Sequence, residues 1–299
     1  MKSRTNFTMI CVECKYEVPC TYYKYKGDYI KLAVCPHCHQ IVDQYVEYDN
    51  VLLFLDLVLV KPQAYRHVCY NVMENQMAIE GVKKGQTSTV TMTQKFQMFG
   101  NLARFIVMMI LFEVYLSWAY EEKKPTHSII YQFILSRDTY IQYISFVFKS
   151  IINHVVFNVT LQWVFFNFLG WKNLINQNLN HEYQTSYYRA SLLSCVLVAN
   201  SIKLLPILML IWPYDQTVQW QKIVGGLAVV NIIEALKNIT NLSYFKIILT
   251  VSLCILVEQV ISIGIASLTI SYYTNYDVYD IFINNYQEII SDISFYINL

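Results

Sequence analysis

Charged residues are scarce in this chain of 299 residues. Only 14% of the residues are charged, whereas 55% are apolar. An average soluble protein carries about 25% charged residues, so the composition argues against a uniform soluble globule. The sequence also lacks internal repeats, coiled-coil heptads and long low-complexity tracts. We therefore expect a membrane protein with a polar head.

Lysine and arginine are absent from residues 247–299, whereas twelve of the 22 lie before residue 105. Because cytoplasmic flanks of membrane spans are enriched in lysine and arginine, we expect the basic N-terminal part to face the cytosol and the C-terminal tail to face the opposite side. This arrangement requires an odd number of spans. It also predicts that the NIT and NLS sequons at Asn238 and Asn241 are cytosolic and unmodified.

Signals for secretion and for catalysis are missing as well. The segment MKSRTNFTMICVEC holds charges but no apolar run, so we expect internal segments to direct targeting. The sequence has no P-loop, G-x-S-x-G, H-E-x-x-H or Asp-His-His-Cys motif, so we expect no enzyme. A membrane-anchored ubiquitin ligase is the best enzyme alternative, although a cross-braced RING needs a second metal site.

Apolar runs near the length of a membrane span fill the second part of the chain. The predicted fold class is a small N-terminal zinc-binding domain followed by an all-α polytopic membrane domain with three to five spans. A polar linker (72–101) precedes the membrane domain (102–271), and an acidic amphipathic tail (272–299) follows it. The predicted spans are about 102–120, 146–169, 190–213, 217–236 and 247–270. The fourth of these either spans or is re-entrant.

Four of the eight cysteines form two C-x-x-C pairs: Cys11, Cys14, Cys35 and Cys38. Two such turns supply four thiolates in a tetrahedron, which is the pattern of structural zinc. With four protein ligands no coordination position stays open, so we expect one structural zinc ion and no hydrolytic chemistry. The alternatives are free cysteines or disulfides, and substitute ligands from Cys20, His37 and His39.

The apolar run VLLFLDLVLV is followed by KPQAYRH. A helix over 51–61 is about 16 Å long, only half of the roughly 30 Å hydrocarbon core, so we expect a short membrane-associated helix that ends at Lys61 and Pro62. Asp56 inside this run must be paired, protonated or near water. Its nearest candidate partners are Lys61, Arg66 and His67. Of these we expect Arg66 to pair with Asp56, with binding of a lipid phosphate by Arg66 as the alternative.

These motifs together resemble the homology domain of the Arv family of lipid-homeostasis proteins. The resemblance rests on the paired cysteines, the VDQYVEYD run of residues 42–49, the FLDL of residues 54–57, and KPQAYRH with Asn71. It covers residues 9–72, within an expected domain of residues 1–71. Beyond this domain only a succession of apolar segments is shared.

The resemblance implies an endoplasmic-reticulum membrane protein that acts in sterol and sphingolipid distribution and in early glycosylphosphatidylinositol (GPI) anchor synthesis. It leaves open a lipid transporter or flippase and a scaffold for GPI-synthesising enzymes. Expected partners are membrane lipids (sterol, sphingolipid and GPI precursors) and those enzymes, with no nucleic acid. The motif residues expected to contact lipid or a partner are Asp43, Tyr45, Glu47, Asp49, Asp56, Lys61, Pro62, Tyr65, Arg66, His67 and Asn71.

Three ionisable residues interrupt the predicted spans: Glu113, Lys203 and Glu258. Charged side chains persist in a membrane when they face a bundle interior or a cavity, so each is a candidate for a functional site. The alternative is that they lie near an interface or pair with one another for packing. Pro206, three residues after Lys203, favours a broken helix of the kind that transporters use.

Overall fold

The structure, a computed structural model, describes residues 9–25, 29–74, 100–124, 127–170, 181–204, 217–274 and 276–297. The chain forms two compact units. The first unit comprises Met1–Arg104, Gln162–Ile202 and Leu227–Ile248. The second comprises Phe105–Leu161, Lys203–Gly226 and Leu249–Leu299. Most of the predicted polar linker lies outside the described residues.

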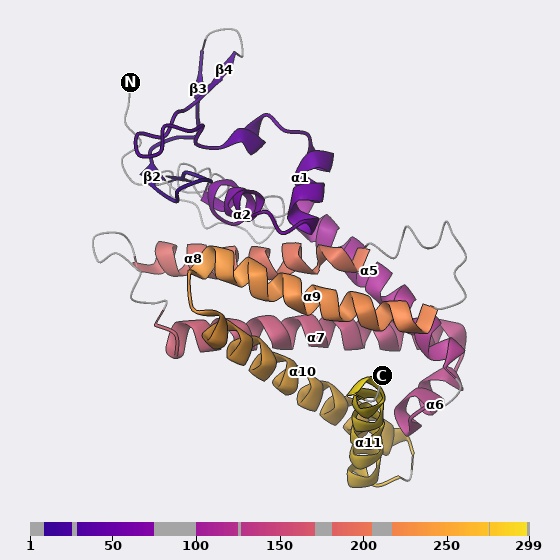
Figure 1. Cartoon of the computed structure of the whole chain (residues 1–299). Coiled ribbons are helices and arrows are strands. Elements are labelled where there is room, and N and C mark those ends of the chain that lie inside the picture. Colours follow the sequence, from indigo (N-terminus) through magenta and orange to yellow (C-terminus); the bar gives the residue numbers. More distant parts are fainter. Residues whose placement is uncertain are drawn as a thin grey trace, which may run out of the picture. The chain divides into compact units, whose positions relative to one another are not determined.

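The N-terminal head, in the first unit, contains two short antiparallel hairpins (Figure 1). Strand β1 (Met9–Ile10) pairs with β2 (Glu17–Val18), and β3 (Tyr22–Lys24) pairs with β4 (Ile30–Leu32). Such short strands bury few side chains, and the cluster of buried residues in the head is Cys11, Val18, Ala33, Cys35 and Val42. Because this core contains two of the paired cysteines, the fold of the head is built around them.

The acidic run that follows the second cysteine pair forms a 3-10 turn, η1 (Gln44–Val46). The Asp43 carboxylate accepts a hydrogen bond from the backbone N–H of Tyr45 (3.1 Å), which caps the turn. Tyr45 is buried, whereas Glu47 and Asp49 are exposed. The alternation of acidic and apolar residues therefore reflects a capped turn with two acids in water.

The short apolar run forms helix α1 (Asn50–Val58), which ends earlier than the sequence predicts. Val60 has a φ of 56°, a left-handed conformation that is unusual for a β-branched residue. Helix α2 (Pro62–Arg66) then begins and continues as a π-helical segment, η2 (His67–Val72). The helix is interrupted before Pro62, as expected, and Pro62 begins the next one, because the first turn needs no N–H from it.

The described residues after the head form seven further helices: α5 (Gly100–Lys123), α6 (Ile129–Leu135), α7 (Thr139–Asn167), α8 (His181–Ala199), α9 (Thr217–Thr240), α10 (Tyr244–Tyr273) and α11 (Val278–Ile297). Within the described part, the helices long and apolar enough to cross a membrane are Thr139–Asn167, Ile223–Thr240 and Tyr244–Tyr273. The first predicted span coincides with α5, and the third begins in α8 and continues outside the described residues.

The long helices expose apolar side chains at helical spacing. On α7 the exposed residues recur every three or four positions at Ile144, Phe148, Ile151, Val155 and Val159. Helix α10 repeats the pattern at Leu249, Leu253, Leu256 and Val260, and α5 at Val107, Leu111 and Tyr115. Such stripes are costly in water and are typical of surfaces that face lipid. The chain is therefore a membrane protein with a mostly helical membrane part.

The tail helix α11 belongs to the second unit and packs against α6 (Figure 1). Ile130 of α6, Ile270 of α10 and Ile281 of α11 form one buried cluster. Asn284 accepts a hydrogen bond from the backbone N–H of Ile129 at 3.4 Å. The C-terminal amphipathic segment thus forms a helix that buries Ile281 against α6 and α10.

Candidate metal centre and intramembrane ion cluster

The two C-x-x-C segments fold into matching turns. In the first, the N–H of Lys15 donates to the Cys11 carbonyl (2.9 Å); in the second, the N–H of His39 donates to the Cys35 carbonyl (3.0 Å). Lys15 and His39 both adopt positive φ angles, 63° and 58°. This conformation ends each turn sharply, so both sulfur atoms of a pair point to the same place.

The four sulfur atoms meet at one point in the head. All lie within 4.8 Å of one another, with Cys11 Sγ 3.7 Å from Cys38 Sγ and Cys14 Sγ 3.6 Å from Cys35 Sγ. A tetrahedral ion with ligands at about 2.3 Å places its sulfurs about 3.8 Å apart, whereas a disulfide requires about 2.05 Å. The spacing fits a four-thiolate metal site, and all eight cysteines are free.

The environment of the second turn favours a thiolate. Burial raises the pKa of the Cys35 thiol, but the backbone N–H groups of Cys38 and His37 donate to its sulfur and bring the pKa from 9.0 to about 7. Burial raises the pKa of Cys11 to about 12. A bound cation would supply the charge needed to keep such a buried thiol deprotonated.

The substitute ligands considered from sequence do not join the site. Cys20, His37 and His39 lie outside the metal-ligating group, which is the one such group among the described residues. The ring of His37 instead stacks on Tyr16, with centroids 5.4 Å apart. A second metal site of the cross-braced kind is therefore not found in the described part of the chain.

Asp43 lies at the centre of a network of buried polar side chains in the head. Its carboxylate is fully buried and lies 2.7 Å from His67 Nδ1. The Asn71 amide donates to the same oxygen at 2.8 Å. Asn71 also pairs with the backbone of Ile10, accepting from its N–H (3.0 Å) and donating to its carbonyl (3.0 Å). The family motif thereby fastens η2 onto the first strand.

Arg66 supports the first cysteine turn. One guanidinium nitrogen, Nη1, donates to the carbonyl oxygens of Val12 (2.6 Å) and Glu13 (2.9 Å), which lie between the two cysteines. The expected pair between Arg66 and Asp56 is therefore wrong. The two residues are close in the sequence, but the left-handed conformation of Val60 between α1 and α2 directs α2 towards the cysteine turn.

Asp56 is paired, as a buried carboxylate in an apolar helix must be. Lys61 Nζ lies 2.7 Å from its carboxylate, and the Tyr45 hydroxyl donates to it at 2.9 Å. Burial acts to raise the pKa of Asp56, but the hydrogen bonds from Lys61 and Tyr45 outweigh it and lower the pKa. The ion pair with Lys61 thus links the start of α2 to α1.

Tyr65 is fully buried, and its hydroxyl has no hydrogen-bond partner among the described residues. Together with Tyr65, most of the motif residues serve contacts inside the head, whereas Glu47 and Asp49 remain on its surface. The motif is therefore first a structural element that shapes the metal centre.

The head also contacts the turn between α9 and α10, within the same unit. Lys15 Nζ donates to the carbonyl of Asn238 (2.8 Å) and to the side chain of Asn241. The Tyr70 hydroxyl donates to the carbonyl of Ile239 (2.9 Å). These contacts hold the α9–α10 turn next to the first cysteine turn.

A second polar site lies inside the helices of the second unit. The two carboxylate oxygens of Glu113 on α5 contact different partners: Lys203 Nζ at 3.0 Å and His154 Nε2 at 2.8 Å. All three side chains are less than one-third exposed. Asn158 donates to the His154 carbonyl at 2.8 Å. Sequence reasoning predicted Glu113 and Lys203 but missed His154 as their partner.

Glu258 of α10, the third predicted intramembrane residue, does not join this cluster directly. It forms no salt bridge within the described residues, although it lies close enough to Lys203 and His154 for an electrostatic interaction. The ionisable residues predicted from sequence are thus brought to one region of the second unit, with Glu113 at its centre.

Comparison with known proteins identifies the relatives of this chain. A family model described as "Arv1-like family" matches residues 10–236. The family likeness therefore continues well past the head, further than the sequence motifs alone indicated. No solved structure matches the chain.

Several curated proteins are similar over most of the chain. "Protein ARV1" of Candida albicans is 37% identical over 97% of this chain and 99% of its own length. "Protein ARV1" of Saccharomyces cerevisiae is 32% identical over 80% of this chain and 84% of its own length. "Protein ARV1" of Homo sapiens is 38% identical, but over only 22% of this chain and 24% of its own length.

Proposed function

Because the chain belongs to the Arv1-like family, we propose that it is an endoplasmic-reticulum membrane protein of lipid homeostasis that moves lipid. The proposed cargo is sterol, sphingolipid or a precursor of the GPI anchor. The head faces the cytosol in this proposal, and no catalytic activity is assigned. Family membership supports the process, and the intramembrane ion cluster supports the movement of lipid.

The observation that carries the proposal is the position of Glu113 between Lys203 and His154. Charged side chains within membrane helices are costly and line pathways for polar groups. A carboxylate shared by Lys203 and His154 can exchange one partner for another as a charged headgroup passes.

The test is lipid movement in liposomes that contain the purified protein. A phospholipid or glycolipid probe with a fluorescent headgroup is incorporated into both leaflets. The rate at which the probe of the inner leaflet becomes accessible to a quencher outside the liposome is measured. We expect Glu113→Gln to lower this rate about tenfold or more, since it removes a charge-assisted interaction. Glu122→Gln, an exposed acid on the same helix, is the matched control and should leave the rate unchanged.

A rate with the wild-type protein equal to that of protein-free liposomes would refute lipid movement. A rate that is high but insensitive to Glu113→Gln would refute the role of the cluster while retaining the transport. The two failures are therefore distinguishable in one set of measurements.

A scaffold for GPI-synthesising enzymes is the second candidate, favoured by the surface of the head. The β3–β4 hairpin exposes Tyr23 (47%), Tyr25 (58%) and Tyr29 (74%). Exposed tyrosines are enriched at protein interfaces. Replacing all three with serine should abolish co-purification of these enzymes, whereas replacing the exposed Tyr272 and Tyr273 of α10 should not. Equal recovery with both variants would exclude this surface.

For the metal centre we propose a single structural zinc ion. Cysteine thiolates at tetrahedral spacing without an open position are the ligand set that zinc prefers. Purified protein should contain about one zinc per chain, measured with a chromogenic chelator, and Cys11→Ser should release it. Cys20→Ser is the matched control, because Cys20 lies outside the ligand group. Retention of zinc after each of the four single ligand changes would refute the assignment.

Helix α1 is proposed to lie in the cytosolic leaflet beside the head. The exposed apolar residues of α1 and its C-cap, Val51, Leu52, Leu55 and Leu59, form one stripe, and Asp56 and Leu57 are buried. Such a helix lies along an interface rather than crossing it. Replacing Leu55 and Leu59 with glutamate should weaken attachment of this segment to lipid without releasing zinc.

A further inference from the structure

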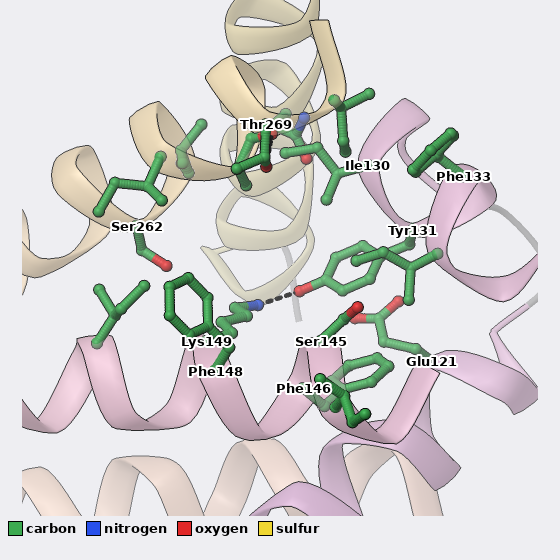
Figure 2. Close-up of a pocket in the computed structure, with 18 of the residues that line it drawn as sticks. Glu121, Ile130, Tyr131, Phe133, Ser145, Phe146, Phe148, Lys149, Ser262 and Thr269 are labelled. Atoms are coloured by element: carbon green, nitrogen blue, oxygen red, sulfur yellow. Dashed lines mark hydrogen bonds between the residues drawn. The ribbon is translucent and has the colours of Figure 1, made fainter. Parts of the chain in front are cut away.

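A cavity of about 690 Å³ lies within the second unit, where α6, α7 and α10 meet (Figure 2). Its size is within the range of about 300–1,000 Å³ that is common for small-molecule sites. It is separate from the Glu113 side chain, which is not among the lining residues. The proposed function therefore leaves this cavity unused.

The wall of the cavity is mainly apolar. Phe133 and Ile130 contribute from α6, Phe148 from α7, and Ile263 and Ala266 from α10. Figure 2 shows these helices facing one another across the space, with Ser262 and Thr269 on the α10 side. An apolar wall with a few polar groups is suited to the hydrocarbon part of an amphipathic molecule.

Lys149 places a cation in this apolar wall. Its ammonium group donates to the Tyr131 hydroxyl and lies 4.8 Å from the centroid of the Tyr131 ring (Figure 2). Tyr131 is itself held by stacking on Phe146, with centroids 6.0 Å apart. An ammonium group has three donors, and the Tyr131 hydroxyl takes one. Lys149 is therefore positioned by its neighbours with capacity left for an anion.

Two cations that line the cavity, Lys149 and Arg137, have no carboxylate in direct contact among the described residues. Arg137, the second cation considered, lies over the ring of Phe133 at 4.7 Å. Neither Arg137 nor Lys149 forms a salt bridge within the part of the chain that the structure describes. Glu121 and Glu258 act on Lys149 only electrostatically. An unpaired cation next to hydrocarbon is costly, so an anionic group from a ligand would stabilise it.

We propose that this cavity binds an anionic phospholipid, with one acyl chain against the apolar wall and the phosphate accepting hydrogen bonds from Lys149. A neutral sterol would fill the apolar space but leave Lys149 without an anion. This inference goes beyond the proposed function, because a lipid can bind in the cavity and stay there without being transported.

The test uses the full-length protein in nanodiscs of phosphatidylcholine. A phosphatidic acid probe with a photoactivatable acyl chain is added at sub-saturating concentration, and the labelled peptides are mapped by mass spectrometry. We expect labelling of α6, α7 and α10 residues that line the cavity. Lys149→Met should lower it about tenfold, since a charge-assisted hydrogen bond is lost. Lys149→Arg should retain most of it.

Two further variants separate charge from folding and from space. Lys123→Met removes an exposed cation outside the cavity and should leave labelling unchanged. Ala266→Trp fills the cavity without changing its charge and should abolish labelling. Retention of the zinc and of the unfolding temperature shows that each variant is folded.

Equal labelling by phosphatidic acid and by a matched phosphatidylcholine probe would overturn the proposal, as would labelling that Lys149→Met does not reduce. Competition by cholesterol but not by phosphatidic acid would overturn it in favour of a neutral ligand. The liposome assay is read in parallel: labelling without lipid movement retains the cavity site and refutes transport, and the converse refutes the site alone.

Discussion

His67 Nδ1 lies 2.7 Å from the carboxylate of Asp43 in the interior of the head. Asp43 is fully buried, and it also accepts hydrogen bonds from Asn71 and from the backbone of Tyr45. Three donors from η1 and η2 therefore converge on one carboxylate. Asn71 also forms two hydrogen bonds with the backbone of Ile10. The Asp43 carboxylate therefore links η1, η2 and, through Asn71, strand β1.

Removing this carboxylate should unfold the head more easily. Asp43→Ala leaves several buried donors unsatisfied, which we expect to lower the free energy of unfolding by about 3 kcal/mol. The measurement is the urea concentration at half-maximal zinc release from the full-length protein in detergent. Asp49→Asn, at an exposed position without a side-chain capping bond, is the control. Equal midpoints for the two variants would show that the network does not stabilise the head.

The Arg66 guanidinium should slow the loss of metal. Arg66→Met removes both hydrogen bonds to the first cysteine turn, each worth about 1–3 kcal/mol with a charged donor. We expect zinc transfer to an excess of chelator to become at least tenfold faster. Lys31→Met, at an exposed position of β4, should not change the rate. An unchanged rate with Arg66→Met would mean that the turn holds its shape without Arg66.

The sequence was sufficient to predict that the four paired cysteines form one group, because each C-x-x-C turn is a local structure that determines where its two sulfurs point. For Asp56 it indicated Lys61, Arg66 and His67 as candidate partners, and the preference for Arg66 was wrong. The pairing with Lys61 depends on the left-handed Val60, and a β-branched residue gives no signal for that conformation. The direction of α2, and with it the position of Arg66, follows from the same break.

In the membrane part, too, the sequence predicts the local elements but not the contacts between them. Runs of apolar residues locate α5, α7, α9 and α10, since a span is recognised from composition and length. His154, in contrast, becomes a partner of Glu113 only when α5 and α7 lie together. Helix pairing depends on side chains that meet across two helices, and a single sequence taken alone does not reveal which faces meet.

Glu74 should make stability depend on pH. It is 4% exposed, and burial raises its pKa from 4.5 to about 7. The folded state then binds a proton that the unfolded state has lost, so stability falls as pH rises from 4.5 to 7 and stays low above 7. The total is about 3 kcal/mol, from 1.36 kcal/mol per pKa unit.

The comparison of Glu74→Gln with the wild type separates the effect of Glu74 on stability from the effects of other titrating groups. Unfolding temperatures are measured between pH 4.5 and 8 for the full-length protein in detergent. The glutamine variant should gain stability relative to the wild type as pH rises to 7. Glu47→Gln, an exposed glutamate of the head, should follow the wild type. Parallel profiles for all three proteins would show that Glu74 ionises normally.

Glu113 and Lys203 should be coupled energetically. Each single neutralisation, Glu113→Gln or Lys203→Met, leaves the other charge without this partner at a 3.0 Å contact. The double variant leaves neither charge, so its loss of stability should be smaller than the sum of the single losses by about 1–3 kcal/mol. Unfolding temperatures in detergent give the cycle. Simple additivity would show that the two residues do not interact.

The sequons at Asn238 and Asn241 should be free of glycan. Lys15 binds the carbonyl of Asn238 at 2.8 Å and the side chain of Asn241, so this turn lies next to the head within one unit. The sequons therefore share the side of the head, which we propose is the cytosol. A glycosidase should leave the mass of the wild-type protein unchanged.

A matched control places a sequon in the tail. Asp292→Asn creates Asn-Ile-Ser within α11, on the side that we expect to be opposite to the head. This variant should gain a glycosidase-sensitive mass, which shows that an acceptor on that side is used. A glycan mapped to Asn238 or Asn241 in the wild type would instead place the head and the α9–α10 turn in the lumen. The positive charge of the N-terminal part would then not determine the orientation.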